Sequence, residues 1–177
     1  MGYVEHANLD ELVGAFPTCG ECGSTMVVRD AWAEWSLIQR EWVLKSVFDH
    51  FVCDICGKET SPIWKLDKAF RQKRIARLND AVRKGQGQRV TVVITAGVRN
   101  HGDDFIRAAC NAVDRFNAFT KDSDPHGEHD FGSVEIDGEK LFWKIDYFDL
   151  AMKAHSPDAA NSAVTHRVLT IMLASEY

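Results

Sequence analysis

Two short cysteine motifs constrain this chain more than any other feature of its sequence. "CGECG" begins at Cys19 and "CDICG" begins at Cys53, with residues 23–52 between the two pairs. Four thiolates in two pairs can surround one zinc ion tetrahedrally, and the glycine after each second cysteine permits the tight turn that such a pair needs. The motifs therefore predict a four-cysteine zinc ribbon, with one ion held by Cys19, Cys22, Cys53 and Cys56.

The predicted metal has a structural role, because protein ligands fill all four positions and leave none for water or substrate. A redox-active pair usually opens a helix after a strand, whereas both pairs here lie in glycine-rich turns, so that alternative is the weaker one. The chain has five cysteines, and "MGYVEHANLDELVGAF" at its start has no basic segment followed by an apolar one. We therefore expect a cytoplasmic protein with no disulfide framework and no membrane span.

The segment between the cysteine pairs is rich in valine, tryptophan and phenylalanine. Residues 25–37 and 41–52 are predicted to form the two arms of a hairpin that rises from one pair and returns to the other. Trp32, Trp35 and Trp42 could stack on nucleic-acid bases. A small ribbon also needs large side chains for its thin core, so we expect at least two of the three there.

A helical pattern follows from Leu66 to a glycine-rich end at Gly85 and Gly87. Two apolar stripes, rotated against each other, predict a break within residues 70–74 and a domain boundary near it. The stripes are formed by Ile63, Leu66 and Phe70 and by Ile75, Leu78 and Val82. We predict a zinc ribbon with an N-terminal extension over residues 1–66 and an α+β domain over 67–177.

Charge is segregated along the chain. Lys and Arg number 4 against 10 Asp and Glu in residues 1–62, 10 against 2 in residues 63–100, and 7 against 14 in residues 101–177. Such a basic middle can contact nucleic-acid phosphates or an acidic partner, although a solvated helix face that neutralises its own acidic neighbours is the favoured alternative. The contact candidates are Lys68, Arg71, Lys73, Arg74 and Arg77.

The rest of the chain predicts helices on one face of a mainly antiparallel sheet. Residues 89–98 are expected to form a buried strand, and residues 103–119 an amphipathic helix with Cys110 as a core thiol. Asp137-Gly138 indicates a two-residue hairpin turn, and residues 166–177 a last strand, with a helix from Ala163 as the competitor. The turn before the helix could hold an anion with Arg99, but a plain connection is favoured.

The polar stretch "DSDPHGEHDFG", residues 122–132, is open to two interpretations. Its side chains could ligate a second metal, or His129 could act as a base beside a carboxylate, with Asp146 or Asp149 arriving from the hairpin. Alternatively the stretch is a turn that caps strand ends, with Phe131 entering the core. We favour the turn slightly. The catalytic candidates are Glu128, His129, Asp130 and Asp146, and the further loop-site candidates are Asp124 and His126.

From Arg74 to the C-terminus, and especially in "TAGV", "DPHGEHDFG", "FWKIDYFD" and "RVLTIMLASEY", the chain resembles an uncharacterised bacterial domain family. Its members often occur on plasmids and other mobile elements, and some carry an N-terminal extension like this ribbon. Relatives often have Asn where this chain has Ser123, which keeps an acceptor but removes an amide. The resemblance implies no reaction.

The sequence is therefore compatible with three functions. The first, which we favour, is a non-enzymatic interaction module in mobile-element biology that binds a nucleic acid or an intracellular protein. The second is a metal-dependent hydrolase or nuclease that uses the loop from Asp124 to Asp130. The third is a protein-only inhibitor with an acidic decoy surface. The sequence leaves open whether the protein is an enzyme.

Overall fold

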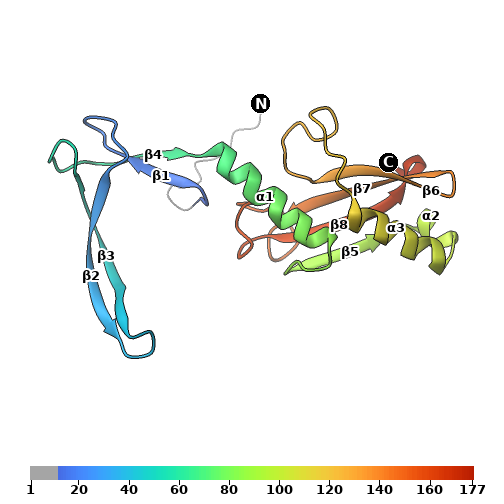
Figure 1. The fold of residues 1–177 in the computed structure, drawn as a ribbon, viewed down its shortest axis with the longest axis horizontal. Coiled ribbons are helices and arrows are strands. Elements are labelled where there is room, and N and C mark those ends of the chain that lie inside the picture. The colour runs from blue at the N-terminus through green and yellow to red at the C-terminus, as the bar shows by residue number, and fades with distance from the viewer. Residues whose placement is uncertain (1–11) are drawn as a thin grey trace. The chain divides into compact units, whose positions relative to one another are not determined.

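The structure is a computed structural model that describes residues 12–177. Most of the predicted N-terminal extension, residues 1–11, lies outside the described residues. The chain forms two compact units, Met1–Asp67 and Lys68–Tyr177, which we call unit 1 and unit 2. Figure 1 colours unit 1 in blue to blue-green and unit 2 from green to red.

Unit 1 is built from two separate pairs of antiparallel strands. β1 (Ala15–Thr18) pairs with β4 (Ile63–Leu66), and β2 (Val27–Ser36) pairs with β3 (Glu41–Cys53). The second pair is a long hairpin whose register shifts twice along its length (Figure 1). It leaves from one cysteine pair and returns to the other, which confirms the two arms expected from the valine- and tryptophan-rich sequence.

The helix predicted from Leu66 begins two residues later and has no break. α1 (Lys68–Arg83) is continuous through residues 70–74, so the predicted interruption is wrong. Ile63 and Leu66, which suggested a separate apolar stripe, belong to β4, where exposure alternates as it does in a strand. The apparent rotation of the stripe thus arose from the joining of a strand to a helix.

Unit 2 is an α+β domain with a four-stranded sheet in the order β5-β8-β7-β6. Its edge strand β5 (Val90–Ile94) runs parallel to β8 (His166–Leu173), whereas β7 (Glu139–Phe148) is antiparallel to both β8 and β6 (Phe131–Ile136). The predicted mainly antiparallel sheet and the last strand are therefore confirmed. The helices are α1, α2 (Ala96–Asn100), α3 (Asp103–Arg115) and the short 3₁₀ helix η2 (Ala174–Glu176).

The core of unit 2 lies between one face of the sheet and the helices. Alternate residues of β7, Leu141, Trp143 and Ile145, are buried against Val82 of α1 and the apolar face of α3. Gly132 is required beside this core, because a Cβ there would lie 2.6 Å from the Trp143 ring. Asp137 and Gly138 both have positive φ, 53° and 82°, as expected of the tight hairpin turn between β6 and β7.

Two burial predictions for unit 2 are wrong. β5 lies at an edge of the sheet, so it is not a buried strand, and Val92 and Val93 are 52% and 37% exposed. Cys110 is exposed rather than a core thiol, because Phe105, Ala109 and Val113 occupy the buried face of α3. Over residues 12–177, no helix has both the length and the apolar character needed to cross a membrane.

Candidate metal centre, hairpin and polar loop

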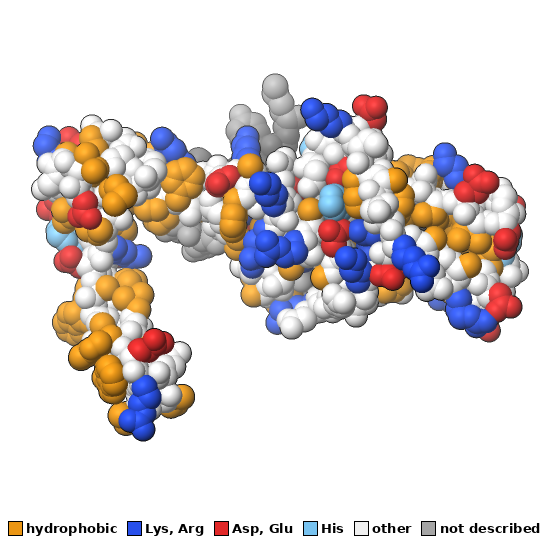
Figure 2. Space-filling view, viewed as in Figure 1, with side chains coloured by type: hydrophobic (Ala, Val, Ile, Leu, Met, Phe, Trp, Pro, Cys, Tyr) orange, Lys and Arg blue, Asp and Glu red, His pale blue; other side chains and the backbone are white. Residues whose placement is uncertain are grey.

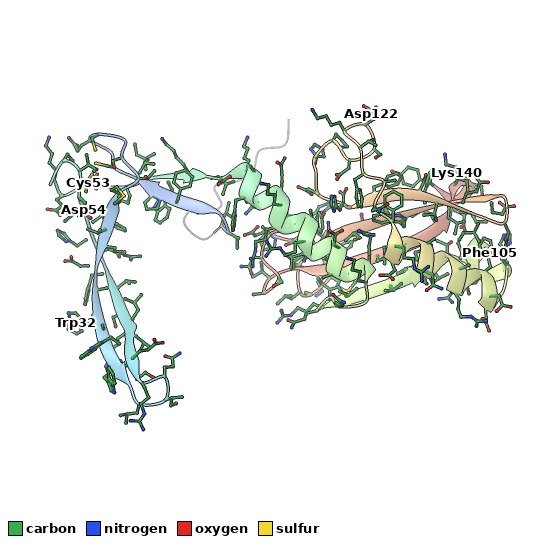
Figure 3. The ribbon with its side chains drawn as sticks, viewed as in Figure 1. Trp32, Cys53, Asp54, Phe105, Asp122 and Lys140 are labelled. Atoms are coloured by element: carbon green, nitrogen blue, oxygen red, sulfur yellow. The ribbon has the colours of Figure 1, made fainter. Side chains whose placement is uncertain are left out.

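The four paired cysteines meet at the base of the β2–β3 hairpin. Their Sγ atoms all lie within 4.8 Å of one another, with 3.8 Å between Cys19 and Cys56 and 3.6 Å between Cys22 and Cys53. Metal–sulfur bonds of about 2.3 Å in a tetrahedral site place the sulfurs roughly 3.8 Å apart. The four sulfurs are therefore spaced to hold one metal ion. Figure 3 marks Cys53 at this position.

The two cysteine pairs are held by equivalent turns. The Gly23 N–H donates to the Cys19 carbonyl over 2.9 Å, and the Gly57 N–H donates to the Cys53 carbonyl over 2.8 Å. Gly23 and Gly57 have φ of 73° and 67°, a region that favours glycine. The glycine that follows each pair in the sequence is thus the residue that lets the chain turn around the metal position.

The surroundings of the thiols favour thiolates at two of the four positions. A hydrogen bond with the Thr60 hydroxyl, followed by one from the Cys22 backbone, lowers the pKa of Cys19 to about 6. The backbone N–H of Cys56 lowers the pKa of Cys53. At Cys22, a backbone hydrogen bond from Ser24 lowers the pKa, but burial and the hydrogen bonds with the neighbouring sulfurs together outweigh it and raise the pKa to about 12. Repulsion between adjacent sulfurs of this kind is relieved when a cation binds among them.

The hairpin above the metal position exposes apolar side chains along its whole length. Trp32, Trp35 and Trp42 are 65%, 48% and 70% exposed, so the expectation that at least two of them lie in the core is wrong. The cysteine cluster organises the base of unit 1, and beyond it no described strand or helix of residues 12–67 forms a second layer on the hairpin. Figure 2 shows the hairpin surface as largely apolar. The other exposed apolar residues are Val28, Leu37, Ile38, Leu44, Val47 and Phe48.

The predicted basic contact residues of α1 divide into two groups. Arg71 pairs with the buried Asp158 carboxylate at 2.8 Å, and Arg74 Nε donates to the Ala160 carbonyl over 2.8 Å. These two cations tie α1 to the segment that precedes β8. The remaining candidates, Lys68, Lys73 and Arg77, are exposed on the surface of unit 2.

The polar loop of residues 122–132 is organised by a buried carboxylate. Asp124 is 8% exposed and accepts the backbone N–H groups of Glu128 at 2.9 Å and His129 at 3.2 Å. Gly127 and His129 have φ of 63° and 54°, so the chain turns sharply around Asp124. This arrangement is an Asx-type cap, which is the turn interpretation of the sequence. His126 is exposed on the same turn.

His129 joins the loop to α1. Its Nδ1 lies 3.0 Å from Asp80 Oδ1, its Nε2 lies 3.8 Å from Asp124 Oδ2, and its ring stacks on Phe119 with centroids 3.8 Å apart. Asp80 also accepts a hydrogen bond from Arg83, which in turn donates to the carbonyls at the end of α3. The His129 ring therefore lies between the Asp80 and Asp124 carboxylates, and its contacts connect the loop to α1.

A second set of contacts under the loop is centred on Asn79, which is fully buried. Its Nδ2 donates to the Glu128 carbonyl over 2.8 Å and to the Tyr147 hydroxyl over 2.7 Å. Its Oδ1 accepts from Arg167 Nε at 2.9 Å. The side-chain amide of Asn79 on α1 thus forms hydrogen bonds with groups of the loop, β7 and β8. Burial raises the pKa of Tyr147 well above its usual range and lowers the pKa of Arg167, as expected for this dry setting.

The carboxylates expected from the hairpin, Asp146 and Asp149, are engaged in contacts of their own. Asp146 pairs with Lys144 at 2.8 Å, and Asp149 accepts the Lys153 N–H over 2.9 Å. Burial, more than any other cause, raises the pKa of Asp130. Within residues 12–177, the four cysteines form the one group of three or more His, Cys, Asp or Glu side chains close enough to share a metal ion. The principal contacts of Asp124 and His129 are thus with the loop backbone and with α1, as expected of residues that hold a turn in place.

Sequence reasoning missed Asn79, Asp80, Arg167 and Glu176. Glu176 is the anion at the start of α2, because its carboxylate accepts from the Thr95 hydroxyl and from the Gly97 and Leu173 N–H groups. The predicted plain connection is therefore wrong in form, because residues 96–100 are the short helix α2, and the carboxylate bound at its start belongs to the same chain. Asn79 carried one available signal, because its polar side chain interrupts the apolar stripe of Ile75, Leu78 and Val82 on α1.

We expect Glu128→Gln to change the pH dependence of unit 2 stability. Burial, with the Asp130 charge second, raises the pKa of Glu128, so the folded state holds this proton more tightly than the unfolded state does. The resulting stability is present below the ordinary glutamate pKa of about 4.3 and is lost as pH rises through the higher folded value. Glutamine can still accept the Tyr147 hydrogen, so the variant should lose less stability between acid and neutral pH than the parent.

The measurement is urea unfolding across that pH range, followed by the circular dichroism of the helices, all of which lie in unit 2 among the described residues. Glu135→Gln, at an exposed position of β6, is the matched control and should keep the parental pH profile. The prediction would be contradicted if the stability of Glu128→Gln depended on pH in the same way as that of the parent.

One known family matches part of this chain. Residues 94–176 match the model of a family described as a protein of unknown function (DUF3768), which confirms the resemblance to an uncharacterised domain. The matched segment begins at the end of β5 and covers α2, α3 and the rest of unit 2. The association with mobile elements stays a prediction. No match was found among curated proteins. Solved structures likewise gave no match.

Proposed function

We propose that this protein is a zinc-stabilised, non-enzymatic interaction module that binds another protein through the β2–β3 hairpin. The observation that carries the proposal is the row of exposed apolar side chains on that hairpin, where Trp42 and Leu44 are 70% and 68% exposed. Monomeric soluble proteins rarely leave contiguous apolar surface of this kind uncovered, and tryptophan is enriched among residues that dominate protein interfaces.

The charges of the hairpin favour a protein partner over a nucleic acid. Phosphate binding requires cations that are available to the ligand. Arg29 forms an ion pair with Asp49, and Lys45 pairs with Glu34 at 2.8 Å. Acidic residues also outnumber basic ones within the hairpin. Arg40 in the turn is the one Lys or Arg of the hairpin outside these two ion pairs, so the tryptophans have little of the surrounding positive charge that accompanies base stacking in single-strand-binding proteins.

Zinc is the metal we assign to the four cysteines. Four thiolates with tetrahedral spacing suit zinc or an iron centre, and zinc is the usual occupant of two CxxC turns on a ribbon. All four ligands come from the protein, so the ion would hold the base of the hairpin and supply no open coordination position. Elemental analysis of the purified chain, with one zinc per chain expected, tests this part directly.

Site-specific photo-crosslinking in cells tests the proposed partner class. A photoreactive phenylalanine analogue at Leu44 should form an adduct with a protein, because this position lies on the exposed apolar row. The same group at Leu150, an exposed leucine of unit 2, is the matched control and should give no such adduct. The partner, once identified, should bind the purified full chain, and Trp42→Ala should weaken that binding by about thirtyfold, as for an interface hot spot.

Two results would contradict the proposal. One is a nuclease-sensitive adduct at Leu44 with an affinity for single-stranded DNA or RNA that falls steeply with salt. The other is an equal yield of protein adducts at Leu44 and Leu150, which would mean that the hairpin has no special role.

A further inference from the structure

We infer that the partner of the hairpin is a second copy of this chain, so that two hairpins pack face to face about a two-fold axis. This inference rests on the proposed function and narrows it to self-association. It concerns one face of the hairpin, defined by Ala31, Ala33, Trp35, Trp42, Leu44 and Val47, which we call the apolar face.

The strand register places these six residues on one side. Trp35 pairs with Trp42, Ala33 with Leu44, and Ala31 with Val47. Directly paired residues share a face of an antiparallel hairpin, and so do residues two apart along one strand. The apolar face therefore follows three alternate pairs. The register shift between Trp32 and Ala33 adds one residue to β3, so Leu44 and Val47, although three residues apart, still pair with Ala33 and Ala31. None of the six side chains is charged. The opposite side differs, because the Glu34–Lys45 ion pair lies there beside Trp32 and Phe48.

Within the described part of unit 1, nothing supplies a second layer for this face. Trp35, Trp42, Leu44 and Val47 are 48%, 70%, 68% and 45% exposed. A two-stranded hairpin is marginally stable in water unless its apolar side packs on something else. β2 and β3 have 10 and 13 residues, so most of the hairpin extends well beyond the support of the cysteine cluster. A covering layer would stabilise it.

The order of side-chain sizes along the apolar face suits a second copy. On β2, the large Trp35 is followed toward the base by the small Ala33 and Ala31. A two-fold axis across the strands beside Ala33 and Leu44 places Trp35 of each copy over Ala31 of the other. It also places Leu44 opposite Leu44 of the second copy and Trp42 opposite Val47. Large residues of β2 then lie above small ones, while β3 brings apolar residues together at and beside the axis, so that apolar side chains fill the layer between the two hairpins as in a β-sandwich.

The available area fits a dimer of modest affinity. A tryptophan side chain presents up to about 250 Å², so Trp35 and Trp42 contribute roughly 300 Å² from each copy. With Leu44, Val47 and the flanking strands, two copies approach the ~1,000 Å² that marks the lower end of specific interfaces. A two-fold arrangement is also the commonest symmetry of protein assemblies. We therefore expect a dissociation constant in the micromolar range.

Sedimentation velocity of the full-length, metal-loaded chain tests the inference, over about a hundredfold in concentration around micromolar values. The parent should shift from monomer to dimer. Leu44→Glu should raise the dimer Kd by about thirtyfold or more, because two like charges would meet at the axis. Ile38→Glu is the control: Ile38 is 94% exposed in the turn, outside the apolar face, so this variant should dimerise like the parent.

A mixture of Leu44→Glu and Leu44→Lys provides the positive test of geometry. Each variant alone should be monomeric, whereas the mixture should form a heterodimer, because the two-fold axis brings position 44 of one copy against position 44 of the other. Leu44 is exposed within one copy, so neither variant should unfold, and equal metal content in both checks this.

Three results would overturn the inference. They are a parent that stays monomeric throughout, a Leu44→Glu variant that dimerises like the parent, and a mixture of the two charged variants that stays monomeric. A monomeric parent that still forms a Leu44 adduct with a different protein would overturn self-association alone and leave the proposed function standing. The absence of any Leu44-specific protein adduct would remove both.

Discussion

Replacing Cys53 with serine is expected to abolish metal binding and unfold the base of the hairpin in unit 1. Cys53 is fully buried among the four sulfurs, and its backbone joins the second cysteine turn to the end of β3. A structural zinc site contributes roughly 10–16 kcal/mol of apparent binding free energy, and most of it is folding free energy. Unit 1 has few buried apolar side chains to replace that contribution. The expected metal content of Cys53→Ser is therefore close to zero.

Hydrogen exchange followed by mass spectrometry, together with elemental analysis, measures this effect. Peptides that cover β1, β4 and residues 50–60 should lose their protection in Cys53→Ser. Peptides from β7 and β8 should keep theirs, because the core of unit 2 includes no metal ligand. Cys110→Ser is the matched control, since Cys110 is an exposed cysteine outside the cluster. Retention of one metal per chain by Cys53→Ser would contradict the assigned ligand set.

Asn79→Leu is expected to destabilise unit 2 by about 3 kcal/mol, although leucine is the better helix former and a similar size. The amide of Asn79 satisfies Arg167 Nε, the Tyr147 hydroxyl and the Glu128 carbonyl in a site that excludes water. Leucine would leave all three without this partner, and the Arg167 guanidinium is only 2% exposed. Arg167 keeps its hydrogen bond to the Ala159 carbonyl, but its Nε–H would be buried without an acceptor, and an unsatisfied hydrogen bond of a charged group costs more than that of a neutral one.

Urea unfolding followed by the circular dichroism of the helices, all of which lie in unit 2 among the described residues, measures the loss. Arg77→Leu, on the exposed side of the same helix, is the control and should change the free energy of unfolding by no more than about 0.5 kcal/mol. Equal effects of the two substitutions would mean that the buried network contributes little. An Asn79→Leu variant that unfolds at the parental urea concentration would contradict the prediction outright.

The four-cysteine cluster was predictable from the sequence because its determinants are local. Each CxxCG stretch forms its own turn, and the glycine supplies the positive φ that the turn needs. The hairpin between the pairs, the Asp137-Gly138 turn and α3 follow from equally short-range patterns of residue type and spacing. The continuous α1 was harder, because Ile63 and Leu66 of β4 imitate a turn of helix when the period is read across the strand-to-helix junction.

Burial and partner choice could not be read in the same way. The tryptophans of the hairpin have the composition of a core, yet they are exposed, since exposure depends on whether a second layer exists. The loop candidates posed the opposite problem. Asp124 and His129 have the chemistry of a site, but their principal partners are the loop backbone and Asp80, which is 49 residues away in the sequence from His129.

By itself, the sequence determined the four-cysteine cluster, the α+β class, most of the strands and helices, and the resemblance to an uncharacterised family. These depend on contacts between residues that are close in the chain or on long matching strings. The tertiary structure alone decided that Asn79 and Asp80 hold the polar loop, that Glu176 takes the anion position of α2, and that one face of the hairpin is apolar and uncovered. Such contacts join distant segments, and their energy depends on which groups are removed from water together.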